Sequence, residues 1–353
     1  MRWSVIGLLA VLLCVMPCRA AEEWKVPGLE EFWEQAEDLG ITREEDFQRG
    51  VEGLLRKTGE ETGELLRGST RTVSRLMAVV LLCGMAQGLQ GDRRELDAVR
   101  LAGALAITAL TMSDVAGMLG MGRETMGRMD LFSRTLLPVM AVLTAAAGSP
   151  ASAAVRQGAT VLFSQLVLQA MDRLLIPLVY AYVSICCASA ALGTPGLDKL
   201  ARLVKGTACF VLSGLLMAFV GYLSASGAVA GSVDAAAIKT AKLAITRVIP
   251  VVGGILADAS ETILSGAAAL RGTVGAAGML VVLSICAVPF LHLAVHYLAY
   301  KVTGTLCALV AQPGLSRLIE DIGGAFGMVL GMTGAAALVL LISLVSALSA
   351  VIP

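Results

Sequence analysis

The feature of this sequence that most constrains its fold is a series of long apolar runs. A helix needs about 20 mostly apolar residues to cross a bilayer, because the hydrocarbon core is about 30 Å thick. Residues 157–171 are either a span of their own or an extension of the next one. We predict an all-α, polytopic transmembrane helix bundle with about seven spans, or eight if residues 157–171 form one. The seven runs are residues 73–89, 99–119, 131–147, 174–192, 209–223, 279–300 and 326–351.

The composition supports a membrane protein and argues against nucleic-acid binding. Hydrophobic residues make up 57% of the chain and charged residues 15%, which is more apolar than a soluble core of this length requires. Lysine and arginine (27) balance aspartate and glutamate (27). Because no basic block stands out, we expect the lipid bilayer, and no nucleic acid, as a partner.

The first twenty residues have the organisation of a signal peptide. Arg2 is followed by an apolar run over residues 5–16 and by Cys18-Arg19-Ala20 before the expected cleavage site. The apolar run is too short to span a membrane comfortably. We predict a signal peptide at residues 1–20, with an uncleaved anchor as the alternative, and an N-terminal region outside the cytoplasm.

Residues 21–70 form the one extended polar stretch, which precedes a transmembrane domain over residues 71–353. The polar stretch places apolar residues at helical spacing, so we predict short amphipathic helices on the extracytoplasmic side. Arg93 and Arg94 follow the first predicted span and indicate a cytoplasmic loop there.

The prolines indicate an internal duplication of the transmembrane domain. Two Pro-Gly-Leu motifs, at Pro195 and Pro313, each open a segment with a further leucine and glycine at the same offsets. We predict repeat copies at about 134–227 and 246–351. The proline pairs, at an offset of 112 that becomes 118 after an insertion, are Pro138 with Pro250, Pro177 with Pro289, and Pro195 with Pro313.

Residues 249–270 are predicted to form a helix that a proline and a pair of glycines interrupt near its start, and that carries polar residues on one face. Broken helices at membrane depth are tolerated where protein or water covers the freed backbone, and paired broken helices in duplicated halves point to a transport site. The alternative is an interfacial helix whose acidic face lies in water. The candidate broken-helix and cavity positions are Pro138, Pro250, Gly253, Gly254, Asp258 and Glu261.

Other candidate groups carry weaker signals. His292 and His296 share one helix face, but no glutamate, cysteine or aspartate accompanies them, so a packed pair is favoured over a metal site. The cysteines of the apolar runs read as small core residues. Asp114 and Asp172 lie near apolar stretches, where carboxylates are costly unless they sit at helix ends. A stripe that permits close helix packing consists of Gly323, Gly327 and Gly331.

Nearly the whole chain resembles a known family. The outer amphipathic region, "IPVVGGILADASETILSGAAALRGTVGAAG" and "LAYKVTGTLCALVAQPGLSRLIEDIGGAFG" are similar to stage III sporulation protein AE of endospore-forming Firmicutes. The block Ile249-Pro250-Val251-Val252-Gly253-Gly254 is the most specific element of the resemblance.

The resemblance implies a function. It implies a non-enzymatic subunit, in the mother-cell membrane around the forespore, of a channel, secretion or feeding complex. Its partners would be other membrane proteins of the same stage III complex and, indirectly, a forespore membrane protein. No catalytic residue, cofactor or metal follows from the resemblance. A stand-alone secondary transporter with duplicated halves remains the alternative.

Overall fold

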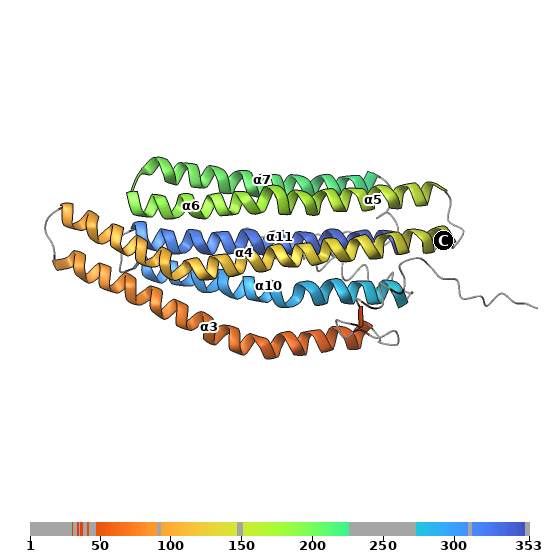
Figure 1. The fold of residues 1–353 in the computed structure, drawn as a ribbon, viewed down its shortest axis with the longest axis horizontal. Coiled ribbons are helices and arrows are strands. Elements are labelled where there is room, and N and C mark those ends of the chain that lie inside the picture. The colour runs from red at the N-terminus through yellow and green to blue at the C-terminus, as the bar shows by residue number, and fades with distance from the viewer. Residues whose placement is uncertain are drawn as a thin grey trace, which may run out of the picture.

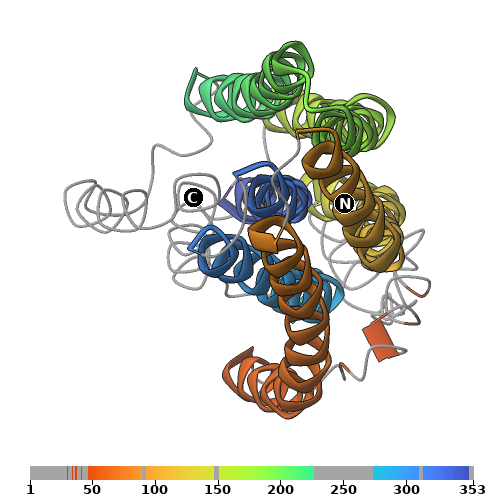
Figure 2. The same cartoon turned by 90° about the vertical axis from the view of Figure 1, so that its left-hand side faces the viewer.

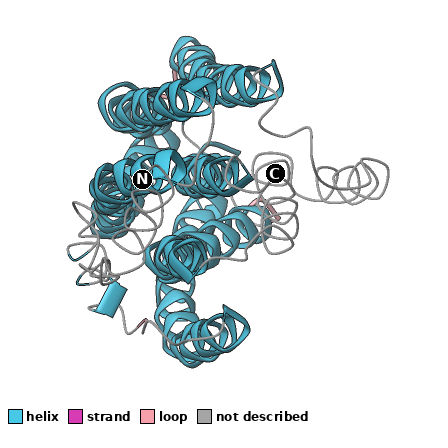
Figure 3. Cartoon of the chain, turned by 90° about the vertical axis from the view of Figure 1, so that its right-hand side faces the viewer, coloured by secondary structure: helices cyan, strands magenta, loops and turns pink. Residues whose placement is uncertain are grey.

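The computed structural model describes residues 47–89, 93–146, 151–225, 273–309 and 313–349, together with Glu30, Glu34, Ala36, Glu37 and Ile41. The described part contains helices and no strand (Figure 3), which confirms the predicted all-α bundle. Its main elements are α3 (Phe47–Leu89), α4 (Arg93–Ala146), α5 (Ala151–Ala170), the π-helical turn η1 (Met171–Leu175), α6 (Ile176–Leu192), α7 (Pro195–Ala225), α10 (Thr273–Cys307) and α11 (Pro313–Ser349).

The helices form antiparallel pairs that turn at one end of the bundle (Figure 1). The last residues of α3, α6 and α10 and the first residues of α4, α7 and α11 all lie at this end, on the left of the figure. The α6–α7 turn is short because Gly193 ends α6 in the left-handed conformation, with φ 65°, and its N–H donates to the carbonyl of Ser189. A glycine adopts this conformation without steric cost.

Two predicted spans lie on a single helix, which corrects the expected boundaries. The helix α4 contains residues 99–119 and runs on through 131–146, at about 1.5 Å per residue, to a length of about 80 Å. The charged residues between the two apolar runs do not interrupt it. Residues 157–171 likewise extend the next helix, because α5, η1 and α6 are continuous. Within the described residues, five helices are long and apolar enough to cross a membrane, and the number of crossings stays a prediction.

The break expected at Pro138 is not present, because α4 continues through this residue. A proline inside a helix removes one backbone hydrogen bond and can kink a helix without ending it. Pro138 is exposed, so its ring does not disturb the packed side of α4. The other expected break, at Pro250, Gly253 and Gly254, lies outside the described residues, as do Asp258 and Glu261.

The centre of the described bundle is α11. Its apolar window is 89% buried, and it packs mainly against α10 and α4, with further contacts to α6 and α5. Seen from the end with the turns, α11 lies between α10 on one side and the α4, α6 and α7 helices on the other (Figure 2). The buried side chains of the core include Phe326, Val329 and Leu344 on this helix.

Glycines bring α11 close to its neighbours. A Cβ added at Gly323 would lie 3.0 Å from the Cβ of Tyr300, and one at Gly327 would lie 2.8 Å from the Tyr297 ring, both on α10. Gly331, the third member of the stripe, is buried. Small residues at such contacts allow helix backbones to approach, which is a main source of helix association in membranes.

Gly327→Leu is expected to destabilise the bundle, because the added side chain overlaps the Tyr297 ring. Overpacking of this kind costs about 1–3 kcal/mol. Thermal unfolding of the purified protein in detergent measures the effect. Gly214→Leu is the matched control, because a Cβ at Gly214, in the exposed middle of α7, meets nothing within 4 Å. Equal melting temperatures for the two variants would show that the α10–α11 contact is not tight.

Candidate functional site

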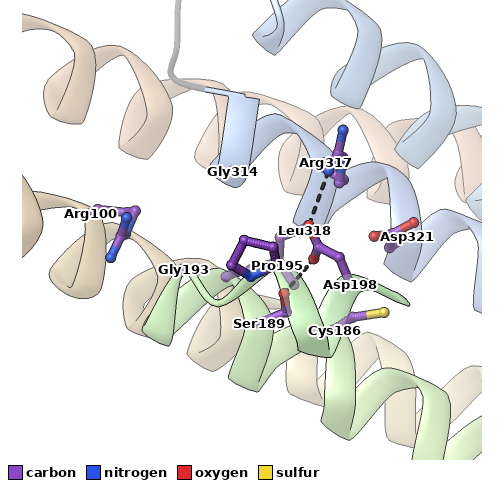
Figure 4. A pocket seen from close by; sticks show the side chains of 11 residues that line it. Arg100, Cys186, Ser189, Gly193, Pro195, Asp198, Gly314, Arg317, Leu318 and Asp321 are labelled. Atoms are coloured by element: carbon purple, nitrogen blue, oxygen red, sulfur yellow. Dashed lines mark hydrogen bonds and ion pairs between the residues drawn. The ribbon is translucent and has the colours of Figure 1, made fainter. Parts of the chain in front are cut away.

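A polar pocket lies at the end of the bundle where the helix pairs turn (Figure 4). Its volume is about 230 Å³. It is formed by the end of α6, the start of α7, the first turns of α11 and one arginine of α4. Its lining includes two basic residues, Arg100 and Arg317, and two acidic residues, Asp198 and Asp321. Ser189 and Cys186 also line it.

Asp198 links three helices at this pocket. The Ser189 hydroxyl of α6 donates a hydrogen bond to the Asp198 carboxylate in the first turn of α7. Arg317 Nη1 of α11 lies 3.1 Å from the other Asp198 oxygen. The two Pro-Gly-Leu motifs therefore open the two helices, α7 and α11, that this ion pair joins, and Figure 4 shows both interactions as dashed lines.

A second polar contact lies deeper along the same helices. The Tyr182 hydroxyl donates to Asp321 Oδ1 at 3.1 Å, which connects α6 to α11. Lys205 Nζ lies 5.8 Å from the centre of the Tyr182 ring, a distance at which a cation is attracted to an aromatic face. A Cβ at Gly324 would lie 3.0 Å from Lys205 Nζ, so this glycine leaves room for the lysine.

Similar contacts join α10 to its neighbours at this end of the bundle. The Tyr300 hydroxyl donates to Asp114 Oδ2 of α4 at 2.7 Å. Lys301 Nζ lies 2.7 Å from Glu320 Oε1 of α11. Burying a carboxylate is costly unless it is hydrogen-bonded or paired, and each acidic group named here has such a partner. The cluster can hold the helix ends in one arrangement and present mixed charge to a small polar ligand.

Two of the acidic residues singled out from the sequence, Asp114 and Asp172, lie within described helices, and each has a partner. Asp114 pairs with Tyr300, and Asp172, in the π-helical turn, lies 2.9 Å from Arg123 of α4. Among the described residues, His296 and His292 do not gather with other side chains into a metal site. The His296 Nδ1 lies 2.9 Å from the backbone oxygen of His292, and its ring meets Phe326 edge-on.

The other candidate ligands do not come together either. Within the described ranges, no three His, Cys, Asp or Glu side chains gather as metal ligands do. Six cysteines of these ranges are free thiols: Cys83, Cys186, Cys187, Cys209, Cys286 and Cys307.

Three charged residues of the pocket, Asp198, Arg317 and Asp321, were not predicted from the sequence. They follow Pro195 and Pro313, which open the two Pro-Gly-Leu motifs, within two or three turns. The available signal was that both Pro-Gly-Leu helices carry charged residues near their starts. Periodicity cannot show that two such starts, more than a hundred residues apart in the chain, lie side by side.

Comparison with known proteins decides the family. The family model described as Stage III sporulation protein AE matches residues 41–350. The chain belongs to this family. The match confirms the resemblance noted in the sequence. It includes every described helix from α3 to α11.

One relative of this family member is the protein of Bacillus subtilis (strain 168) called Stage III sporulation protein AE. It is 26% identical over 243 residues, or 67% of this chain. The matched region is 59% of the relative's own length. No solved structure matches the chain.

Tyr182→Phe is expected to lower the stability of this family member by about 1 kcal/mol, because it removes a partly buried hydrogen bond. The measurement is thermal unfolding in detergent. Tyr180→Phe, two residues away on α6, is the control, because Tyr180 is 44% exposed and its hydroxyl makes no hydrogen bond within the described residues. A loss as large in the control as in Tyr182→Phe would refute a specific role for the Asp321 contact.

Proposed function

We propose that this chain is an integral membrane subunit of a sporulation-specific channel or secretion complex that links the mother cell and the forespore. The observation that carries the proposal is the family match over residues 41–350. The part of the chain that the structure describes has five helices with the length and composition of membrane spans, which agrees with a multi-pass protein. The proposed role is structural and non-enzymatic, in the mother-cell membrane around the forespore.

The packing of α11 favours a subunit over a transporter that works alone. A route for polar solutes needs polar side chains or water along its walls. The described centre of this bundle is instead filled by α11, whose residues from Ile322 to Ser349 carry no charged side chain. The buried residues of this stretch are mostly aliphatic. A route would therefore run between subunits, and the partners would be other membrane proteins of the same stage III complex.

The experiment measures how the abundance of the chain depends on its partners. The tagged full-length protein is quantified in sporulating cells from which the neighbouring membrane proteins of the complex are deleted one at a time. We expect its abundance to fall several-fold in at least one deletion, while its transcript level stays unchanged. An unrelated sporulation membrane protein in the same cells is the control.

The opposite result would support the alternative. Unchanged abundance in every deletion, together with failure to co-purify any of these membrane proteins, would overturn membership of a complex. That outcome would favour a stand-alone secondary transporter with duplicated halves.

A further inference from the structure

Two polar contacts join α4 to the continuous α5–α6 helix. At the end with the turns, Arg100 Nη2 of α4 donates to the backbone oxygen of Leu192, at 3.4 Å. Farther along, Arg123 Nε lies 2.9 Å from Asp172 Oδ1 in the π-helical turn. The two helices are antiparallel, so these contacts define two levels along the bundle.

The stretches between the two levels are almost free of charge. Residues 174–192 contain no Asp, Glu, Lys or Arg, and residues 101–122 contain one, Asp114, which is bonded to Tyr300. At about 1.5 Å per residue, these stretches measure about 28 Å and about 33 Å. The hydrocarbon core of a bilayer is about 30 Å thick, so its thickness matches the distance between the two levels.

The outward surface between the levels is apolar. Large apolar side chains point away from the described bundle along both helices, where the hydrocarbon of a bilayer would cover them. An apolar surface of this kind is stable against lipid tails and unfavourable against water. These residues are Leu101, Leu105, Leu110 and Met112 on α4, and Leu174, Tyr180 and Leu192 on the α5–α6 helix.

Beyond the Arg123–Asp172 level, α4 carries pairs of charged side chains on its surface. Arg128 lies 2.8 Å from Glu124, and Arg134 lies 2.8 Å from Asp130. The side chains of the first pair are 63% and 66% exposed. Charged side chains that face lipid at the centre of a bilayer are costly and rare, whereas exposed pairs of this type are ordinary in water.

We propose that the bilayer encloses the bundle only between the Arg100 level and the Arg123–Asp172 level. The hairpin of residues 124–146 and 151–170 then projects about 35 Å beyond the membrane, at about 1.5 Å per residue. Basic residues near two of the turns, Arg93 and Arg94 after α3 and Lys199 and Arg202 after α6, favour a cytoplasmic location for the turns by the positive-inside rule. The hairpin lies on the opposite, extracytoplasmic side, within reach of a neighbouring protein or membrane.

The test compares leucines that are equally exposed on the protein but lie on different sides of Arg123. Leu105 and Leu131 of α4 are 58% and 61% exposed, and Leu162 of α5 is 70% exposed. A nitroxide is attached to a cysteine at each position in turn, in the full chain with its native cysteines replaced, in lipid nanodiscs. A high rate of collision with oxygen then shows that the nitroxide lies in lipid. A high rate of collision with a water-soluble nickel chelate shows that it lies in water.

We expect oxygen collisions to dominate at Leu105, and nickel collisions to dominate at Leu131 and Leu162. Lipid-like values at all three positions would overturn the proposal, because the bilayer would then cover both halves. The reverse order would place the bilayer on the other half and would also overturn it. The purified chain contains no partner, so none of these outcomes bears on membership of a complex.

A second measurement keeps the native cysteines, in case their replacement disturbs folding. Leu105→Trp and Leu131→Trp are made in a chain whose three native tryptophans, Trp3, Trp24 and Trp33, are replaced by phenylalanine. Lipids brominated on their acyl chains quench tryptophan on contact. The proposal requires strong quenching at position 105 and weak quenching at position 131, and equal quenching at both would refute it.

Discussion

The burial of α11 among its neighbours is the interaction on which the rest of the bundle depends. In the part of the bundle that a bilayer encloses, the hydrophobic effect gives little drive for one helix to leave lipid for another, so close packing must supply it. Glycines allow close packing of α11 against both α4 and α10. A Cβ at Gly122 of α4 would lie 2.1 Å from Val329 of α11, and Gly323 and Gly327 of α11 face Tyr300 and Tyr297 of α10.

Polar groups then set the position of each helix along its own axis. Apolar packing alone allows a helix to slide by a turn at modest cost, whereas a slide of one turn would separate each hydrogen-bonded or paired carboxylate from its partner. The pairs Asp198–Arg317, Asp321–Tyr182 and Asp114–Tyr300 lie toward the end with the turns, and Arg123–Asp172 lies farther along. Together they give the bundle a definite register.

The fold class could be predicted from the sequence. The helix boundaries and the pocket could not. Long apolar runs identify membrane helices because bilayer thickness sets their length. Residues 99–119 and 131–147 were predicted as separate spans, whereas one helix runs through residues 93–146 and includes the charged stretch from Arg123 to Arg134. These residues favour a helix, and their i, i+4 pairs support it. The Asp198–Arg317 contact could not be predicted, since it depends on the arrangement of helices distant in the chain.

The central claim is that the three turns of the bundle share one side of the membrane. Topology reporters inserted after Leu89, Gly193 and Leu309 in the full chain test it most directly, with insertions after Glu60 and Ala146 for the opposite end. We expect the first three reporters to be cytoplasmic and the last two to be extracytoplasmic. A reporter after any one of the three turns that reads on the opposite side from the other two would contradict it.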